Sequence, residues 1–208
     1  MKSSLSVYFI MGSQNCAQPL ETLERALQAG ISCFQFREKG AGALTGDAYV
    51  LFAQTCQQLC KQYNVPFIVN DDVALALALD ADGIHVGQND PAIHTFRECA
   101  QRKIIGVSVH NETQLEEAVR GGADYVGIGP IYPTTSKDDA EPPAGPRFLR
   151  RARTLYPHLP IVGIGGIHEQ NAHIVRQNGA DGVAVISAIC QSNDIDATIA
   201  QLRQEVLR

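Results

Sequence analysis

Short apolar runs alternate along the chain with longer segments in which apolar residues recur every three or four positions. The short runs are rich in Val, Ile, Phe and Tyr, a pattern typical of strands that are buried on both faces. These runs predict eight strands, at residues 6–11, 31–36, 66–70, 83–86, 104–109, 124–129, 160–165 and 181–186. The longer segments predict helices, among them residues 21–30, 46–63, 112–122, 169–180 and 194–207.

Three of these helices carry residues that commonly end or begin a helix. The first is predicted to end at Gly30 and the third at Gly121, because glycine often follows the last helical turn. The last is predicted to begin at Asn193 or Asp194, since either side chain can cap a first turn.

The even spacing of strands and helices predicts the fold class. Eight βα units of about 25 residues favour an α/β protein with a closed (β/α)8 TIM barrel, in which residues 1–208 form a single domain. A weak internal repeat supports this fold, since several strands are preceded by the same order of a helix, a small turn and a polar or acidic residue. An open, doubly wound sheet is the alternative. The one long irregular segment, residues 130–146, predicts an active-site loop that closes as a lid.

Composition and charge narrow the classes of function. The chain has 208 residues, 45% of them hydrophobic, and its formal net charge of -5 argues against a nucleic-acid partner. No apolar run approaches the ~18 residues of a membrane span, and the first residues show no signal-cleavage pattern, so we expect a cytoplasmic protein without a membrane partner. The six cysteines include no Cys-x-x-Cys pair, which favours reduced and mostly buried thiols over disulfides or a zinc site.

Charged residues follow several strands at the end where functional sites form in a parallel barrel. Arg37, Lys39 and Lys137 lie at such positions and together could bind a phosphate-rich polyanion. Asp71 and Asp90 follow the third and fourth strands, which are neighbours in a barrel. Because Mg²⁺ prefers one or two carboxylates with water and phosphate oxygens, these residues predict a site for a Mg²⁺–diphosphate complex.

A second phosphate site is predicted at the ends of the seventh and eighth strands. Glycines in residues 163–167 would let backbone N–H groups approach phosphate, and residues 184–187 end the last strand beside them. The segment is not a dinucleotide fingerprint, because His168 stands where the third glycine is required.

Three polar residues near this rim have other predicted roles. Asp72 is predicted to cap the helix that follows it rather than to bind metal. His85 lies within a strand and is interpreted as a satisfied core residue, whereas His110 follows its strand and could contact substrate.

Eight motifs, taken in order, resemble those of the thiamine-phosphate synthase family. They are VYFIMGS, QFREKG, PFIVNDD, ADGIHVGQND, IIGVSVH, GADYVGIGPIYPTTSK, PIVGIGGI and GVAVISAI, and the resemblance extends from residue 6 to residue 192. It implies a (β/α)8 transferase that joins hydroxymethylpyrimidine diphosphate to a thiazole phosphate, or to its carboxylated precursor, and gives thiamine monophosphate and diphosphate. It also implies a dissociative alkyl transfer assisted by one Mg²⁺ per active site.

The resemblance further implies roles for particular residues. The implied catalytic residues are Arg37, Lys39, Ser108 and Lys137. The implied ligands of the pyrimidine diphosphate are Gln35, Phe36, Arg37, Glu38, Lys39, Asn70, Ser108 and Lys137. The implied ligands of the thiazole phosphate are Thr134, Thr135, Ser136, Gly166, Ile186 and Ser187, and those of the metal are Asp71 and Asp90. Ser136 stands where the family usually has Thr, but it keeps the hydroxyl.

Other functions stay open at this point. A thiazole tautomerase of the same fold would use a His at the position of His110 for proton transfer and would need no diphosphate site. A Schiff-base aldolase needs a Lys within a strand, whereas Lys103 only begins the fifth strand. A non-catalytic phospholigand-binding protein is a third alternative. We expect small-molecule substrates, and the sequence leaves a homo-oligomer open.

Overall fold

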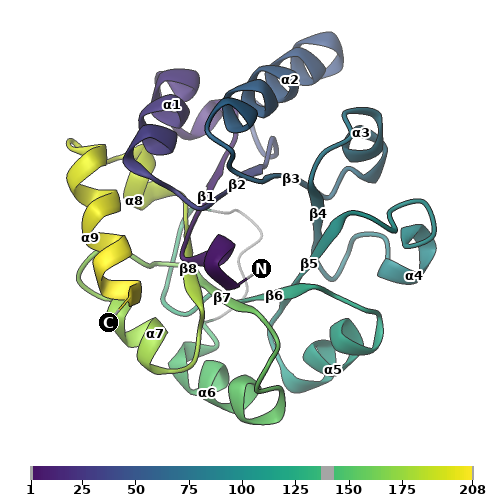
Figure 1. Cartoon of the computed structure of the whole chain (residues 1–208), viewed down its shortest axis with the longest axis vertical. Coiled ribbons are helices and arrows are strands. Elements are labelled where there is room, and N and C mark those ends of the chain that lie inside the picture. The colour runs from purple at the N-terminus through teal and green to yellow at the C-terminus, as the bar shows by residue number, and fades with distance from the viewer. Residues whose placement is uncertain (1, 137–142, 208) are drawn as a thin grey trace.

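The computed structural model describes residues 2–136 and 143–207, and these residues form eight parallel strands that close into a barrel (Figure 1). Each strand pairs with the next along the chain and β8 pairs with β1, which confirms the predicted TIM barrel and excludes the doubly wound sheet. The strands are β1 (Val7–Met11), β2 (Cys33–Phe36), β3 (Phe67–Asn70), β4 (Gly83–Val86), β5 (Ile104–Val109), β6 (Tyr125–Ile128), β7 (Ile161–Ile164) and β8 (Gly182–Val185). Every strand lies inside its predicted range.

Helices α1 to α9 surround the barrel as an outer ring, and the short η1 (Lys2–Leu5) lies inside this ring at one end of the barrel, against β1, β7 and β8 (Figure 1). A second short turn, η2 (Ser13–Asn15), follows β1. The helices of the ring are α1 (Pro19–Ala29), α2 (Gly46–Gln62), α3 (Val73–Ala78), α4 (Ile93–Phe96), α5 (Glu112–Arg120), α6 (Gly145–Leu155), α7 (Ala172–Gln177), α8 (Ser187–Cys190) and α9 (Ile195–Leu207). Helix α6 begins inside the irregular segment predicted at 130–146, so the last residues of that segment are helical. Residues 137–142 of the segment lie outside the described residues, and its action as a lid stays a prediction.

The helix ends agree with most of the predicted caps. Gly30 ends α1 in the left-handed conformation, with φ of 92°, and Asp194 accepts a hydrogen bond from the Ala197 N–H at 3.0 Å where α9 begins. Gly121 follows α5 with φ of -72°, and Gly122 adopts the left-handed conformation instead, with φ of 83°. Helix α7 is shorter than predicted, because the residues before Ala172 form a turn.

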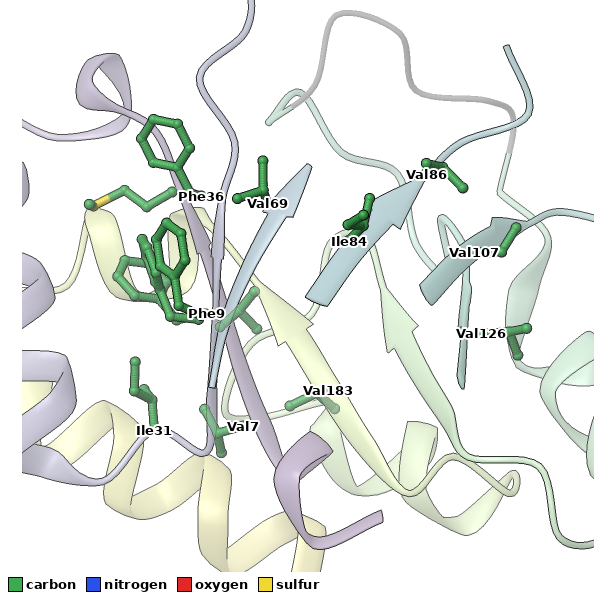
Figure 2. Close-up of a cluster of buried hydrophobic side chains, with 14 of the residues drawn as sticks. Val7, Phe9, Ile31, Phe36, Val69, Ile84, Val86, Val107, Val126 and Val183 are labelled. Atoms are coloured by element: carbon green, nitrogen blue, oxygen red, sulfur yellow. The ribbon is translucent and has the colours of Figure 1, made fainter. Parts of the chain in front are cut away.

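Apolar side chains of most strands alternate between two separate clusters. Val7 and Phe9 of β1 pack outward in the large cluster that includes helix residues, and Figure 2 shows such side chains from several strands. Tyr8 and Ile10 belong to a second cluster drawn almost entirely from alternate strand positions, which fills the inside of the barrel. The near-continuous apolar strands therefore bury both faces, as expected for a parallel barrel.

The polar residue that is repeated before several strands has a structural role at the N-terminal ends of the strands. Asp82, Asp124 and Asp181 stand just before β4, β6 and β8. Each accepts a hydrogen bond, at 2.8 to 2.9 Å, from a backbone N–H at the start of the neighbouring strand. The donors are Phe67 of β3, Ile105 of β5 and Ile161 of β7. Ser32 makes the equivalent contact with the Val7 N–H at 2.9 Å. These side chains satisfy backbone donors where each parallel pairing begins.

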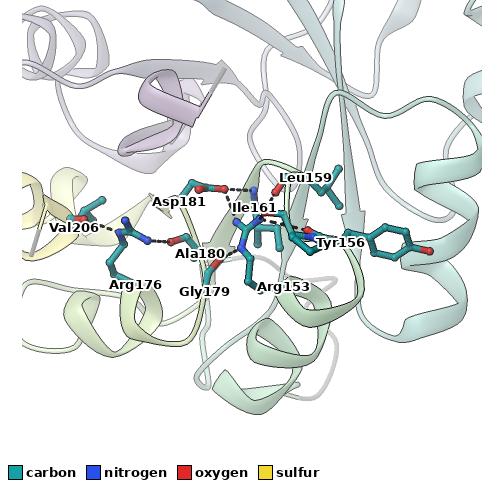
Figure 3. A network of polar contacts seen from close by, with 10 residues as sticks. Arg153, Tyr156, Leu159, Ile161, Arg176, Gly179, Ala180, Asp181 and Val206 are labelled. Carbon is teal, nitrogen blue, oxygen red and sulfur yellow. Dashed lines mark hydrogen bonds and ion pairs between the residues drawn. The ribbon is translucent and has the colours of Figure 1, made fainter.

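Arg153 joins several segments at this same end of the barrel (Figure 3). Its guanidinium pairs with Asp181 at 2.6 Å and donates to the carbonyls of Gly179, Pro157 and Leu159 at 2.7 to 2.9 Å. Leu5 of η1 is fully buried beneath the interior cluster, where its carbonyl lies against Gly182. This end of the barrel is therefore closed, and an opening can form only at the other.

The structure also bears on the predictions about the cysteines and about membrane-spanning segments. All six cysteines are free, but only Cys33, Cys56 and Cys60 are buried, and burial raises the pKa of these three thiols. Cys99 is exposed, so the prediction of mostly buried thiols was only partly right. Within 2–136 and 143–207, every helix is too short or too polar to cross a bilayer.

Candidate active site

A pocket of about 160 Å³ opens at the C-terminal ends of the strands, where the sequence predicted the functional rim. It is lined by residues at the ends of β2 to β8 and in the loops that follow them. The predicted site residues that line it are Arg37, Lys39, Asn70, Asp71, Asp90, Ser108, Thr134, Ser136, Gly166, Ile186 and Ser187. Seven segments of the sequence thus contribute cations, acids, hydroxyls and glycines to one cavity.

Cations and carboxylates meet on one side of this pocket. Lys39 Nζ lies 2.9 Å from Asp71 Oδ2, and Arg37 lines the same wall. Asp71 has a φ of 63°, in the left-handed region, because the chain turns sharply after β3 while the Asp71 N–H donates to the His85 carbonyl at 2.8 Å. Asp90 Oδ2 accepts the Gly87 N–H at 2.7 Å, which fixes the carboxylate over the turn after β4.

The charge balance of this corner fits a divalent cation. Burial and the adjacent Asp90 carboxyl raise the pKa of Asp71, while Lys39 opposes that rise. Two carboxylates in contact repel each other, and a divalent ion between them would relieve the repulsion. Residues 2–136 and 143–207 contain no group of three or more His, Cys, Asp and Glu side chains that could hold a metal ion by themselves. Two carboxylates are few ligands for such an ion, and Mg²⁺ commonly takes its other ligands from phosphate and water.

Asp72 has the structural role that was predicted for it. Its Oδ1 accepts the Leu75 N–H at 2.9 Å and caps α3, and its Oδ2 accepts the Tyr49 hydroxyl at 3.1 Å. Neighbouring aspartates thus differ in function: Asp71 faces the pocket, and Asp72 faces the helix.

Glu38 was predicted as a substrate ligand, but the structure turns its carboxylate toward the protein. Its two oxygens accept hydrogen bonds from the Ser13 N–H and Ser13 hydroxyl at 2.6 Å and from the Leu44 N–H at 2.7 Å. Glu38 does not line the pocket. Glu38 lies at the start of the loop after β2, which carries Arg37 and Lys39. Its hydrogen bonds tie this position to Leu44 at the far end of the same loop and to Ser13 in the loop after β1.

Two further predicted ligands lie below or outside the pocket. Gln35 is almost fully buried inside the barrel and lines a water-sized hollow of about 10 Å³ beneath the pocket floor. Phe36 faces the opposite side of β2, where it packs on Tyr49, Phe52 and Phe67, so its side chain is directed away from the pocket. Strand parity explains the difference, since successive side chains point to opposite faces.

The other two predicted ligands are not brought into the pocket by the described structure. Thr135 is exposed and is absent from the pocket lining, whereas its neighbours Thr134 and Ser136 both line it. Lys137 lies outside the described residues, so its predicted role is carried forward as a prediction.

The opposite wall of the pocket is built from glycines and hydroxyls. Gly166 has a φ of 63°, and a Cβ there would lie 2.6 Å from the Pro133 carbonyl oxygen, so the loops after β6 and β7 approach each other only because residue 166 is glycine. The Ser136 hydroxyl donates to Ser187 Oγ at 3.2 Å across the cavity edge. The arrangement leaves backbone and hydroxyl donors around a space suited to a phosphate.

A buried chain of polar side chains runs from the hollow up to the pocket. Gln35 Nε2 donates to Tyr8 at 2.9 Å, and the Tyr8 and Tyr125 hydroxyls are 2.8 Å apart. Tyr125 contacts His85 Nδ1 at 2.9 Å, and His85 Nε2 contacts Ser108 Oγ at 2.8 Å. His85 is thus a satisfied interior residue, as predicted, and Ser108 connects the chain to the pocket.

Sequence reasoning missed several lining residues because they are small or apolar. Gly127, Ile164 and Ala184 form the pocket floor at inward positions of β6, β7 and β8. The alternation of inward and outward positions along each strand is the signal that could have identified them. His110 also lines the pocket, with its Nδ1 2.5 Å from the Gly129 carbonyl. In contrast, Lys103 lies at the closed end and pairs with Asp80, far from any Schiff-base position.

The sequence and the fold are both similar to those of known proteins. Residues 7–189 match the family model described as thiamine monophosphate synthase. The thiamine-phosphate synthase of Lysinibacillus sphaericus is 58% identical over 96% of this chain and 94% of that protein, and that of Geobacillus kaustophilus is 54% identical over 99% and 94%. The solved structure of thiamine phosphate pyrophosphorylase from Pyrococcus furiosus is 34% identical, covers 99% of this chain and 97% of that one, and superposes with a TM-score of 0.87.

Proposed function

This chain belongs to the thiamine monophosphate synthase family and is a transferase of thiamine biosynthesis, and we propose that its rim pocket joins a pyrimidine diphosphate to a thiazole phosphate. The products are thiamine monophosphate and diphosphate. One observation carries the assignment of the site: Arg37, Lys39, Asp71 and Asp90 meet on one wall, opposite a wall of glycines and hydroxyls. The reaction requires two anion sites of different character on either side of one reacting carbon.

The diphosphate group would bind at the charged wall. Arg37 offers a planar fork for two phosphate oxygens and Lys39 a single positive charge. Asn70, which ends β3, lines the same wall and can donate through its amide. Lys137 is proposed to add a third cation when the loop of residues 130–146 closes.

We propose that Asp71 and Asp90 hold one Mg²⁺ at this wall. When bound, this ion would supply positive charge to the oxygens of the leaving diphosphate. Lys39 already pairs with Asp71 at 2.9 Å, so the diphosphate would take Lys39 as a partner while the carboxylate turns to the ion.

The pyrimidine ring would enter the barrel mouth above the hollow that Gln35 lines. The pocket and the hollow adjoin each other, because both are lined by Ser108, Gly127, Ile164 and Ala184. Within the described residues, Gln35 Oε1 is buried and has no hydrogen-bond partner. The exocyclic amine of an aminopyrimidine is a donor of suitable size, and pairing with it would remove the cost of that unsatisfied acceptor.

The thiazole phosphate would bind at the opposite wall. Gly166 and Ser187 line it, Ile186 contributes an apolar contact, and Thr134 and Ser136 hold the neighbouring loop, where the Ser136 N–H donates to Thr134 Oγ1 at 3.2 Å. The thiazole nitrogen would then face the methylene carbon of the pyrimidine across the cavity.

The chemistry proposed for these residues is stabilisation of a leaving group. The bond between the methylene carbon and the diphosphate oxygen breaks, and both electrons leave with the diphosphate. The thiazole nitrogen then donates its lone pair to the methylene cation and forms the new C–N bond. Arg37, Lys39 and Ser108 stabilise the departing anion, and the walls position the two partners without an enzyme nucleophile. Exclusion of water by the 130–146 loop would protect the cation.

One assay tests the proposal. Purified protein is given both precursors, with and without Mg²⁺, and thiamine monophosphate and diphosphate are measured together. We expect equal amounts of the two products, loss of turnover without Mg²⁺, and a fall of roughly 100-fold or more for Arg37→Ala. Product formation at the wild-type rate in Arg37→Ala would exclude the charged wall as the diphosphate site. We also propose that the enzyme acts on these small molecules in the cytoplasm.

A further inference from the structure

The hydrogen bonds of the buried chain beneath the pocket can all run in one direction. Gln35 Nε2 can only donate, so the Tyr8 oxygen accepts it, and in a chain of one direction the Tyr8 proton is donated to the Tyr125 oxygen 2.8 Å away. The Tyr125 proton is then directed to His85 Nδ1. Burial raises the pKa of both phenols well above the usual value, so each keeps the proton that it donates.

This direction determines the tautomer of His85 and the orientation of Ser108. Because Nδ1 accepts from Tyr125, a neutral imidazole carries its proton on Nε2. That proton is donated to Ser108 Oγ, 2.8 Å away. The Ser108 oxygen is thereby used as an acceptor from below, which leaves its own proton to be donated into the pocket that it lines.

The backbone of β5 is adapted to this chain. A Cβ at Gly106 would lie 2.1 Å from Tyr125 Cζ, 2.4 Å from the Tyr125 oxygen and 2.5 Å from His85 Nδ1. The hydrogen bond between Tyr125 and His85 crosses β5 at the point where that strand has no side chain. The Tyr8 and Tyr125 rings also pack edge to face, 5.9 Å between centroids, which fixes the hydroxyls against each other.

We propose that Tyr125 is a positioning residue for the transfer reaction, which acts through His85 to hold Ser108 as a hydrogen-bond donor to the departing diphosphate. The proposal rests on the function proposed above. Tyr125 lines neither the pocket nor the hollow, so its action on the substrate is indirect.

The two ends of the hydrogen-bonded chain, Gln35 and Ser108, would face opposite charges as the reaction proceeds. At the lower end, the unpartnered Gln35 Oε1 would accept from the aminopyrimidine, which becomes positive. At the upper end, Ser108 would donate to the diphosphate, which becomes more negative at the breaking bond. Hydrogen bonds aligned head to tail polarise one another, so charge at both ends strengthens every link. The stabilisation is greater in the transition state than in the ground state and should affect kcat more than KM.

The experiment combines kinetics with ¹⁵N NMR of histidine-labelled protein, in which the His85 signals are assigned by their loss in His85→Gln. We expect His85 to be protonated on Nε2 and not on Nδ1 in the wild type. Tyr125→Phe should lower kcat roughly tenfold, leave KM for both substrates within about twofold, and give a mixture of His85 tautomers. Tyr63→Phe is the matched control, because the Tyr63 hydroxyl accepts a hydrogen bond from the exposed Gln28 at 3.1 Å on the outer helices, and its loss should affect neither readout.

The outcomes separate the two proposals. A wild-type His85 protonated on Nδ1 would reverse the chain and overturn the inference, as would an unchanged kcat in Tyr125→Phe. A rise in KM with the wild-type tautomer retained would show a merely structural role and would also overturn it. If Tyr125→Phe fails to fold, Tyr8→Phe breaks the adjacent link and should lower kcat in the same direction. Absence of product from the wild type would reject the proposed function, while the NMR result would still decide the direction of the chain.

Discussion

Lys39 Nζ lies 2.9 Å from Asp71 Oδ2 at the mouth of the pocket, so a proposed diphosphate ligand and a proposed metal ligand are paired with each other. Binding of a Mg²⁺–diphosphate complex would exchange this pair for two stronger ones, since each partner would gain an oppositely charged ligand. The pair would therefore give each charge a partner before substrate binds, and it would separate when the proposed complex binds.

Asp71→Asn should weaken the response to Mg²⁺ much more than it weakens folding. An amide removes the negative charge but keeps the size, so we expect a rate roughly 100-fold lower at limiting Mg²⁺, with partial recovery at high Mg²⁺. The measurement is initial rate against Mg²⁺ concentration at saturating precursors. Asp72→Asn is the matched control, because Asn also caps helices and Asp72 faces α3. Equal Mg²⁺ dependence in the two variants would remove Asp71 from the metal site.

Glu38→Gln should disturb the diphosphate-binding loop without removing a substrate contact. The amide nitrogen would face either the Ser13 N–H, which Oε2 now accepts at 2.6 Å, or the Ser13 hydroxyl and the Leu44 N–H, which Oε1 now accepts at 2.6 and 2.7 Å. We expect about 2 kcal/mol less stability toward urea and inhibition by pyrophosphate that is roughly tenfold weaker. The exposed Glu24→Gln serves as a control for the loss of one negative charge. Unchanged pyrophosphate inhibition, despite lower stability, would show that the Glu38 contacts do not position the cations.

The fold could be predicted from the sequence because its signals are local and repeated. Short apolar runs at even spacing determine the strands, and turn residues such as Asp124 mark where each begins. The rim could be predicted in outline, since residues that follow strands converge there in any such barrel. Strand parity was the missing step for Gln35 and Phe36: one points inward to the hollow, and the other packs outward on α2.

The buried chain could not be predicted in the same way, because it depends on contacts between distant strands. Tyr8 and Tyr125 are 117 residues apart and each lies in a run that otherwise reads as apolar. A tyrosine buried in an apolar strand needs a hydroxyl partner, but the sequence does not say which residue supplies it. Glu38 presents the same difficulty, since its partners Ser13 and Leu44 follow from the loop path rather than from any pattern.

Arg153→Met should reduce stability without affecting catalysis, because Arg153 lies at the closed end of the barrel (Figure 3). The change keeps the aliphatic stem but leaves Asp181 and four carbonyl groups without their common donor. We expect a loss of roughly 3 kcal/mol in the free energy of unfolding in urea, with kcat and KM unchanged while the protein is folded. Arg120→Met is the matched control, since Arg120 makes an exposed i,i+4 pair with Glu116 and should cost less than about 0.5 kcal/mol. A specific fall in kcat for folded Arg153→Met would contradict the separation between the two ends.

Gly166→Ala should damage the proposed thiazole-phosphate wall more than any other part of the enzyme. A methyl group at residue 166 would lie 2.6 Å from the Pro133 carbonyl oxygen and 2.8 Å from Tyr132 Cβ, so the loops after β6 and β7 must separate. We expect KM for the thiazole phosphate to rise roughly tenfold or more while KM for the pyrimidine diphosphate changes little, because the charged wall is formed by other strands. Gly122→Ala isolates the effect of backbone strain, since its φ of 83° is also left-handed but nothing lies within 4 Å of the added Cβ. Each variant should lose about 1 kcal/mol of stability to backbone strain, Gly166→Ala should lose more because of its clash, and only Gly166→Ala should alter KM. A parallel rise in both KM values would mean that the two walls move together, and the division of the pocket into separate anion sites would then be wrong.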